Sequence, residues 1–313
     1  MMTIVYILAA LIAALVLVLL LGYFVFPQIL FKLMTAIIRW RGRMREKSIQ
    51  VGDNVWPYLE GGRDDGVPIV LLHGFGGDKD NWSIYSRYLT PHHRLISPDL
   101  PGFGGNDRSL DRDYDIPAQS KRLKAFLDAM GIAECHIGGN SMGGHIALQF
   151  ALDYPDKTAS LCLFNNAGII GKKKSELMIA TEKGENALAL KNVSDVDRLM
   201  AFIFYKPVPM PKNFKKLFFA EADAHHALLD KIFWQIVDSS INHPLNERLG
   251  EVAAPSLIIW GRHDRLIDVS CVAVLDKGIR NSEAVILEEA GHVPMIERPR
   301  ETAAIHRSFL AKH

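Results

Sequence analysis

Ser141 has the local sequence that a nucleophilic serine requires. It lies in the segment Gly-Asn-Ser-Met-Gly-Gly (139–144), between an apolar run that predicts a strand and a run that predicts a helix. Small residues on both sides of the serine allow the sharp strand-to-helix turn known as a nucleophile elbow. This turn exposes the hydroxyl at the end of the strand, where the helix N-terminus favours developing negative charge. The alternative is a glycine-rich turn with an incidental serine.

A serine hydroxyl is a weak nucleophile until a base and an orienting acid activate it. Asp264 follows the predicted strand 256–260 in the segment Gly-Arg-His-Asp, and His292 follows the predicted strand 284–287 on a loop after a glycine. Their order after the serine and their positions beyond strand ends predict Asp264 as the acid and His292 as the base. Asp268 is the rival acid, but its position before an apolar helical run favours a helix N-cap.

Two backbone N–H groups are candidates for an oxyanion hole. The segment His-Gly-Phe-Gly-Gly (73–77) closes the first strong predicted strand, and Met142 directly follows the candidate nucleophile. We predict that the N–H groups of Phe75 and Met142 bind the developing oxyanion. Such a donor contributes about 3 kcal/mol to transition-state stabilisation.

These residues need a sheet that brings strand ends to one edge. Short, mostly apolar runs alternate with helical patterns, which is typical of a mostly parallel sheet flanked by helices, the α/β class. The predicted strands are 69–72, 94–97, 135–138, 160–164, 256–260 and 284–287. Between 169 and 250 the pattern changes to helices rich in Phe and Leu. The sequence therefore predicts a core of residues 48–168 and 251–313, with a helical cap at 169–250 inserted between two strands.

The N-terminal residues 1–26 predict a transmembrane anchor. From Thr3 to Phe26 the 24 residues carry no charge, which is enough for about 36 Å of helix against a bilayer core of about 30 Å. A cleavable signal peptide is the alternative, but the basic n-region is missing and no Ala-x-Ala-like site ends the run. Ala9 with Ala13, and Ala10 with Ala14, have the spacing that lets two such helices approach, so a homodimer is one expectation.

Residues 27–47 combine apolar positions with six cations, which are Lys32, Arg39, Arg41, Arg43, Arg45 and Lys47. This composition predicts a basic juxtamembrane helix that lies at the interface and contacts anionic headgroups. A solvated linker that only sets topology is the alternative. The charge bias taken alone places the catalytic domain on the cytoplasmic side, although a single span offers no second loop for comparison.

Composition excludes several classes of partner. The chain has 36 basic and 35 acidic side chains and a net charge of +1, so no global field recruits nucleic acid, and we expect no nucleic-acid partner. The three cysteines are widely spaced and form no Cys-x-x-Cys pair, which argues against a disulfide framework or a zinc site. We expect no metal and no organic cofactor.

The motifs HGFGG, DLPGFG, GNSMGG, WGRHD and AGHVPMIERP occur in this order from about Val67 onward. Together they resemble the α/β-hydrolase superfamily, and within it the membrane-anchored monoacylglycerol lipases and related bacterial lipases. Residue by residue, the resemblance implies Ser141 as nucleophile, Asp264 as acid, His292 as base, and Phe75 with Met142 as oxyanion donors.

We therefore expect a membrane-anchored serine ester hydrolase that cleaves glycerolipids such as monoacylglycerol or lysophospholipid through an acyl-enzyme. Its expected partners are membrane lipids and a fatty acyl substrate or product. Two alternatives remain open. The meta-cleavage-product hydrolases, which break a carbon–carbon bond, have a similar elbow, but they carry a Gly-Pro-containing oxyanion loop where this chain reads HGFGGDKDNW. The second alternative is a non-catalytic lipid-binding hydrolase fold, which the presence of all three triad residues disfavours.

Overall fold

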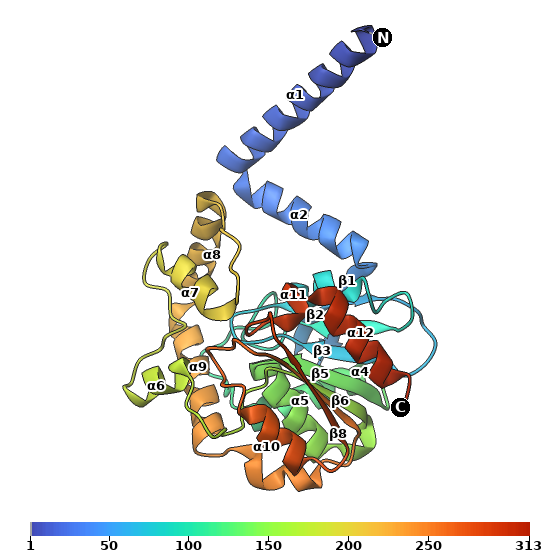
Figure 1. Ribbon diagram of the computed structural model, residues 1–313, viewed down its shortest axis with the longest axis vertical. Helices are drawn as coiled ribbons and strands as arrows, with labels where there is room; N and C mark the ends of the chain where they lie inside the picture. Colours follow the sequence, from blue (N-terminus) through green and yellow to red (C-terminus); the bar gives the residue numbers. More distant parts are fainter. Residues whose placement is uncertain (1) are drawn as a thin grey trace.

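The computed structural model describes residues 2–313 and is built around one eight-stranded sheet (Figure 1). The strand order is β1-β2-β4-β3-β5-β6-β7-β8. Six strands pair in parallel: β3 (Ile69–Leu72), β4 (Leu95–Pro98), β5 (Cys135–Asn140), β6 (Thr158–Phe164), β7 (Ser256–Gly261) and β8 (Ser282–Leu287). Each of them overlaps a strand expected from the sequence. The α/β-hydrolase fold class predicted from the sequence is confirmed.

The parallel strands are buried because helices cover both faces of the sheet. The first face is covered by α4 (Ile116–Ala129), α5 (Met142–Asp153) and α10 (Cys271–Gly278). The second is covered by the 3-10 helix Lys79–Trp82 and by α3 (Ser83–Ser86), α11 (Pro294–Glu297) and α12 (Pro299–Leu310). This double cover explains why the strands read as short, continuous apolar runs.

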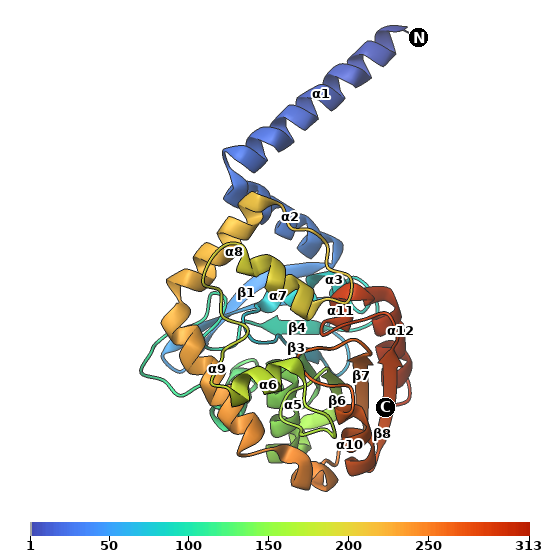
Figure 2. The ribbon, with the colours of Figure 1, turned by 60° about the vertical axis from the view of Figure 1, so that its left-hand side comes forward.

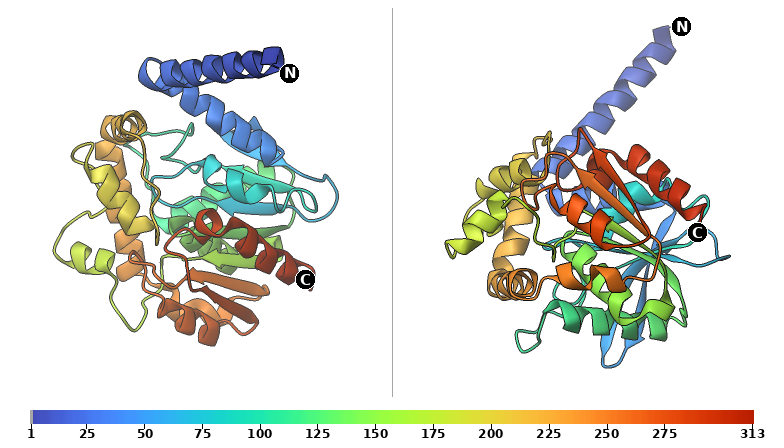
Figure 3. Two further views of the ribbon diagram at one scale, coloured as in Figure 1. Left: turned by 45° about the horizontal axis from the view of Figure 1, so that its top comes forward. Right: turned by 60° about the horizontal axis from the view of Figure 1, so that its bottom comes forward.

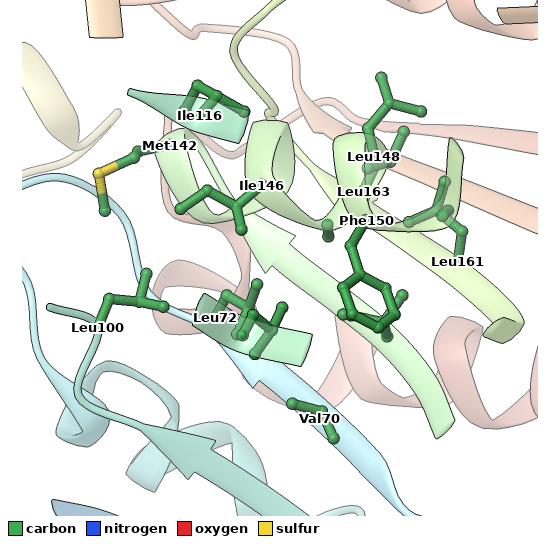
Figure 4. Packing of buried hydrophobic residues seen from close by; sticks show 14 of the residues in the cluster. Val70, Leu72, Leu100, Ile116, Met142, Ile146, Leu148, Phe150, Leu161 and Leu163 are labelled. Carbon is green, nitrogen blue, oxygen red and sulfur yellow. The ribbon is translucent and has the colours of Figure 1, made fainter. Parts of the chain in front are cut away.

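Strand residues alternate between the two faces. Val70 and Leu72 of β3 pack in the same buried cluster as Ile146 and Phe150 of α5, and Figure 4 shows these side chains together. Ile69 and Leu71 belong to the cluster on the opposite face, with aromatic residues of α3 and α12. The core therefore fixes the positions of β3 and β5, and with them the positions of the turns that follow these strands.

Four helices lie between β6 and β7 in sequence and stand together beside the sheet (Figures 1 and 2). They are α6 (Glu176–Glu182), α7 (Asp195–Ile203), α8 (Lys212–Ala224) and α9 (His226–Ile241). Leu228, Ile232 and Ile236 of α9 pack into the main core cluster. The insertion is thus anchored to the sheet domain along α9, while α7 and α8 lie farther out.

Helix α1 (Met2–Phe24) projects away from the rest of the molecule, and none of its residues is buried (Figure 3). By length and composition it is able to cross a membrane. Ala9 and Ala13 are both exposed on α1, and self-association through them stays a prediction.

Helix α2 (Pro27–Arg41) follows after a bend and is shorter than the helix expected for residues 27–47. Gly42 caps it, Arg43 has a positive φ of 56°, and the next residues form β1 (Met44–Val51), which pairs antiparallel with β2 (Asn54–Gly61). The cations Arg45 and Lys47 therefore lie on a strand. This edge pair was not predictable from the sequence, because its strands are polar on the exposed side and carry no strong apolar signal.

Candidate active site

Ser141 occupies the turn between β5 and α5, as the elbow motif predicts. Its φ of 57° and ψ of −119° lie in a region that residues with a Cβ rarely adopt. The surrounding structure holds this conformation: Ser141 N–H donates to the Phe164 carbonyl at 3.1 Å, and the Ser141 carbonyl accepts from Ala167 N–H at 3.0 Å. The strain therefore presents the serine at the C-terminal end of the central strand and at the start of a helix.

His292 and Asp264 meet at the same edge of the sheet. His292 Nδ1 lies 2.8 Å from Asp264 Oδ2, and both side chains are almost completely buried. The second carboxylate oxygen of Asp264 accepts from the N–H groups of Leu266 at 2.8 Å and Ile267 at 3.0 Å. A proton on Nδ1 that is held by the carboxylate leaves Nε2 as the basic nitrogen of the ring.

Asp268, the rival acid, lies elsewhere. Its Oδ1 accepts from Ser270 N–H at 2.9 Å, in the turn that precedes α10. The structure thus pairs Asp264, and not Asp268, with His292. Among the other histidines, His263 stacks on Tyr205 with ring centroids 4.1 Å apart, and His145 is fully buried in α5. Burial lowers the pKa of His145 to about 3, so that side chain stays neutral.

Two asparagines that the sequence analysis did not single out hold the triad loops together. The Asn140 amide donates to the His292 carbonyl at 2.9 Å and to the Phe164 carbonyl at 3.0 Å. The Asn165 amide donates to Asp264 Oδ2 at 2.6 Å, and Asn165 has a positive φ of 46°. Asparagine tolerates this left-handed conformation better than most residues. Their positions at the ends of β5 and β6 were the available sequence signal.

The predicted oxyanion loop runs directly beside the elbow. A Cβ added to Gly74 would lie 3.3 Å from the Ser141 Cβ, so the glycine permits this close approach. His73 anchors the loop, since its Nε2 accepts from Leu100 N–H at 3.0 Å and its Nδ1 lies 2.8 Å from the Gly74 carbonyl. Burial lowers the pKa of His73, which keeps the ring neutral and suits it to accept this hydrogen bond.

The side chain of Phe75 faces other aromatic rings. Its ring lies edge-on to Phe103 at 5.7 Å and to Phe233 of α9 at 5.9 Å between centroids. Met142 is buried at the first turn of α5. The two predicted oxyanion donors come from two elements next to Ser141: Phe75 follows Gly74 in the loop after β3, and Met142 begins α5.

A carboxylate links the inserted helices to the histidine loop. Glu297 accepts from Tyr205 N–H at 2.8 Å and from Gly291 N–H at 2.7 Å, and His292 N–H donates to the Ile203 carbonyl at 2.8 Å. The chain after α7 is thereby fixed to the loop that carries the histidine. Glu297 lies within the motif AGHVPMIERP, but the motif alone indicates no role for this residue.

Within the described residues 2–313 no group of three or more His, Cys, Asp or Glu side chains is arranged to hold a metal ion. The three cysteines are all buried and unpaired, and burial raises the pKa of Cys135 and Cys271 to about 12. These thiols are therefore poor nucleophiles at neutral pH.

Asp78, in the loop after Phe75, leads to a pH-dependent prediction. Burial raises its pKa from 3.8 to about 6, and the carboxylates of Asp80 and Asp99 add to the effect, while Lys79 opposes it. The folded protein therefore binds this proton more tightly than the unfolded chain. The contribution of this proton to the free energy of unfolding is fully present below pH 3.8 and is lost as the pH rises through about 6.

We expect Asp78→Asn to raise the free energy of unfolding at about pH 7.5 by about 1 kcal/mol, with a smaller gain at about pH 4.5. The asparagine oxygen still accepts the hydrogen bond that Asp78 Oδ1 receives from Asp80 N–H at 2.8 Å. Urea unfolding of both proteins across this pH range measures the difference. The same pH dependence in the two proteins would contradict this prediction.

A strained serine at a strand-to-helix turn, a buried histidine–carboxylate pair and a mostly parallel sheet define the α/β-hydrolase class. The family model described as the alpha/beta hydrolase fold matches residues 67–299, and the chain belongs to this family.

Among its relatives is Lipase 1 of Psychrobacter immobilis, which is 36% identical over 253 residues, or 80% of this chain and 79% of that protein. Monoacylglycerol lipase ABHD6 of Mus musculus is 30% identical over 252 residues, or 78% of this chain and 75% of that protein. A solved membrane phospholipase A, described as a bacterial virulence factor, superposes with a TM-score of 0.88 at 37% identity and 98% coverage of both chains. These relatives support a lipase-type hydrolase.

A meta-cleavage-product hydrolase from Pseudomonas fluorescens also superposes, with a TM-score of 0.75 at 22% identity and with 85% of this chain and 97% of that chain covered. At this identity the likeness shows a shared fold only. The membrane phospholipase, together with the apolar α1, supports membrane anchoring of this chain.

Proposed function

We propose that this protein is a single-pass, membrane-anchored serine ester hydrolase that cleaves acyl esters of glycerolipids, such as monoacylglycerol or lysophospholipid, through an acyl-enzyme. The observation that carries the proposal is the strained Ser141 at the sheet edge where the buried His292–Asp264 pair also lies. In this proposal residues 48–168 and 251–313 form the catalytic core, and residues 169–250 form its cap.

The proposed reaction uses only groups of this chain. His292 Nε2 takes the Ser141 proton while Oγ attacks the acyl carbonyl, and the Asp264 carboxylate stabilises the imidazolium. The N–H groups of Phe75 and Met142 bind the tetrahedral oxyanion. His292 then protonates the leaving alcohol. A water molecule, activated by the same histidine, hydrolyses the acyl-enzyme and releases the fatty acid.

Membrane attachment favours a lipid substrate. Helix α1 spans the bilayer in this proposal, and α2 lies at the interface with exposed apolar side chains that include Ile29, Leu33 and Trp40. At the end of α1, Tyr23 contacts α8, where its carbonyl accepts from the Asn213 amide at 2.9 Å. Figure 2 shows α8 beside α2. In this proposal the inserted helices therefore lie at the level of the membrane surface, where a lipid acyl chain is available.

The test is hydrolysis of a lipid panel by the purified full-length protein in detergent micelles and in vesicles. The panel contains monoacylglycerol, lysophospholipid, diacyl phospholipid, a short-chain ester and a vinylogous diketone, with Ser141→Ala as the control for background. We expect release of fatty acid from a glycerolipid by the wild type only. Turnover of the diketone alone would favour the carbon–carbon hydrolase, and no turnover of any compound would favour the non-catalytic alternative.

A further inference from the structure

The juxtamembrane helix α2 reaches the segment that follows the oxyanion loop through one arginine. Arg39 Nε donates to Asp80 Oδ1 at 2.7 Å and Nη2 donates to Asp80 Oδ2 at 2.5 Å, which is a two-point fork on one carboxylate. The remaining Nη1 donates to Glu46 of β1 at 2.5 Å. Arg39 and Asp80 are both mostly buried, with 21% of each side chain exposed. A fork of this kind fixes direction as well as distance.

Asp80 is rigidly connected to the loop that carries Phe75. Asp80 N–H donates to Asp78 Oδ1 at 2.8 Å, Ser83 Oγ donates to Asp80 Oδ1 at 3.0 Å, and Gly77 N–H donates to the Gly74 carbonyl at 3.1 Å. Only five positions separate Asp80 from Phe75. Movement of the Asp80 carboxylate would therefore be transmitted to the predicted oxyanion donor over a short, hydrogen-bonded stretch of backbone.

The end of α2 is attached to the same region by a second set of contacts. The Gly42 carbonyl accepts from Thr90 Oγ1 at 3.0 Å and from Ser86 Oγ at 3.3 Å. These bonds join the C-terminus of α2 to α3 and to the turn after it. Helix α2 is thus seated directly on the segment that continues the oxyanion loop, and Figure 2 shows α3 beside the end of α2.

The local charges make Arg39 necessary for this arrangement. Lys79 Nζ lies 2.9 Å from Asp99 Oδ2 and 3.2 Å from Glu46 Oε1, and the side chains of Lys79 and Asp99 are buried. Arg39 is the second cation of the network, beside Asp80 and Glu46. Without Arg39, the Asp80 carboxylate would lose its ion pair, and Lys79 alone would remain beside Glu46 and Asp99. A part-buried carboxylate that loses its partner moves toward solvent or toward another cation.

We propose that Arg39 is a positioning residue, which through Asp80 holds the oxyanion loop in its productive place and so ties the seating of the juxtamembrane helix to catalysis. The inference rests on the ester hydrolysis proposed for Ser141. A displacement of about 1 Å at a catalytic donor is enough to slow a reaction on the order of 100-fold. A smaller displacement of the oxyanion donor should therefore lower the rate by a smaller but measurable factor.

The experiment compares the full-length wild type with Arg39→Gln, in neutral detergent and with a short-chain chromogenic ester. Arg63→Gln is the matched control, because Arg63 makes the same two-point fork to Asp65, at 2.8 and 2.7 Å, on an exposed loop. We expect Arg39→Gln to lower kcat about tenfold with KM within about twofold, since the loss lies in the transition state. Arg39→Lys restores the charge without the fork and should recover only part of the rate. Arg63→Gln should behave as the wild type.

Asp80→Asn and the double variant identify the route of the effect. If Arg39 acts through Asp80, the double variant loses no more kcat than either single variant. Additive losses would overturn the proposal, and so would a lower Tm for Arg39→Gln with unchanged kcat, because that result indicates a purely structural role.

The rate at which a fluorophosphonate labels Ser141 provides a readout that is independent of the ester. An active wild type with an unaffected Arg39→Gln contradicts only the positioning role. If the wild type is labelled but hydrolyses no ester, and Arg39→Gln is labelled more slowly than the wild type, the proposed substrate class is contradicted and the positioning role is supported. A wild type that neither hydrolyses esters nor is labelled removes both proposals.

Discussion

Replacing Asp264 by asparagine is expected to lower kcat for ester hydrolysis by on the order of 10³- to 10⁴-fold. The reason lies in the hydrogen bonds at this position. One carboxylate oxygen accepts from the His292 ring and from the Asn165 amide, at 2.8 and 2.6 Å, and the other accepts from two backbone N–H groups. All four partners of the carboxylate are donors.

An asparagine in this place has one acceptor oxygen and one donor nitrogen. If its oxygen stays on the two backbone N–H groups, its NH₂ faces the His292 ring and favours the tautomer with the proton on Nε2. That nitrogen then has no lone pair with which to take the Ser141 proton. If the amide is reversed, the two backbone N–H groups face another donor, and the loop that carries residue 264 is destabilised.

The matched control is Asp268→Asn, since Asp268 is four residues away and was the rival acid. Asparagine keeps a side-chain oxygen that accepts a hydrogen bond, so the hydrogen bond from Ser270 N–H persists. We expect its kcat to stay within about twofold of the wild type. Steady-state kinetics on one ester measure kcat of the three proteins, and circular dichroism checks that all three are folded. A large loss in Asp268→Asn with little loss in Asp264→Asn would reverse the assignment of the acid.

The parallel core was predictable because its signals are local. The strand at 69–72 has the same bounds in the structure, and β5 and β6 each extend their predictions by two residues at one end. Their residues are apolar on both faces and are bounded by turn-forming segments. Ser141, Asp264 and His292 could be placed because each follows such a strand. In a parallel sheet, position along the chain therefore indicates position in space.

Interactions between distant segments could not be predicted in this way. The strands β1 and β2 lie at the sheet edge and carry polar side chains, so the sequence predicts that the basic run from Arg43 to Lys47 continues the preceding helix. The chain instead turns at Gly42, whose carbonyl is held by Ser86 and Thr90. Those partners are more than forty residues away in sequence, and no periodicity indicates them.

The polar residues that support the site were missed for the same reason. Asn165 and Glu297 are ordinary polar residues in sequence, and their importance comes from which backbone and side-chain groups they meet after folding. Arg39 was counted as one of six juxtamembrane cations, but it differs from the others in its fork to Asp80. Composition shows that this segment is basic, but it does not tell which cation would contact lipid headgroups and which forms an ion pair within the protein.

Gly143 is a position near the site where a single methyl group should damage the fold. A Cβ there would lie 2.4 Å from the Leu72 carbonyl oxygen and 2.5 Å from the His73 carbonyl oxygen. Both are backbone atoms at the point where β3 passes into the oxyanion loop, so no side-chain rotation relieves the clash. The start of α5 and the loop must move apart instead.

We expect Gly143→Ala to lower the free energy of unfolding by about 3 kcal/mol, the upper end of the usual cost of overpacking. Activity should fall on the order of 100-fold in the protein that remains folded, because the two predicted oxyanion donors sit on the two elements that separate. Gly250→Ala is the control, since a Cβ at Gly250 meets no atom within 4 Å, and its stability should change by less than about 0.5 kcal/mol.

Urea unfolding and the rate of fluorophosphonate labelling measure the two effects separately. Labelling is scored per folded molecule, so that loss of protein is not mistaken for loss of reactivity. Equal stability and equal labelling of the Gly143→Ala and wild-type proteins would show that α5 and the oxyanion loop can adjust to the added methyl group without moving the two donors apart. In that case the close packing of α5 against the end of β3 would not be what sets the distance between the two donors.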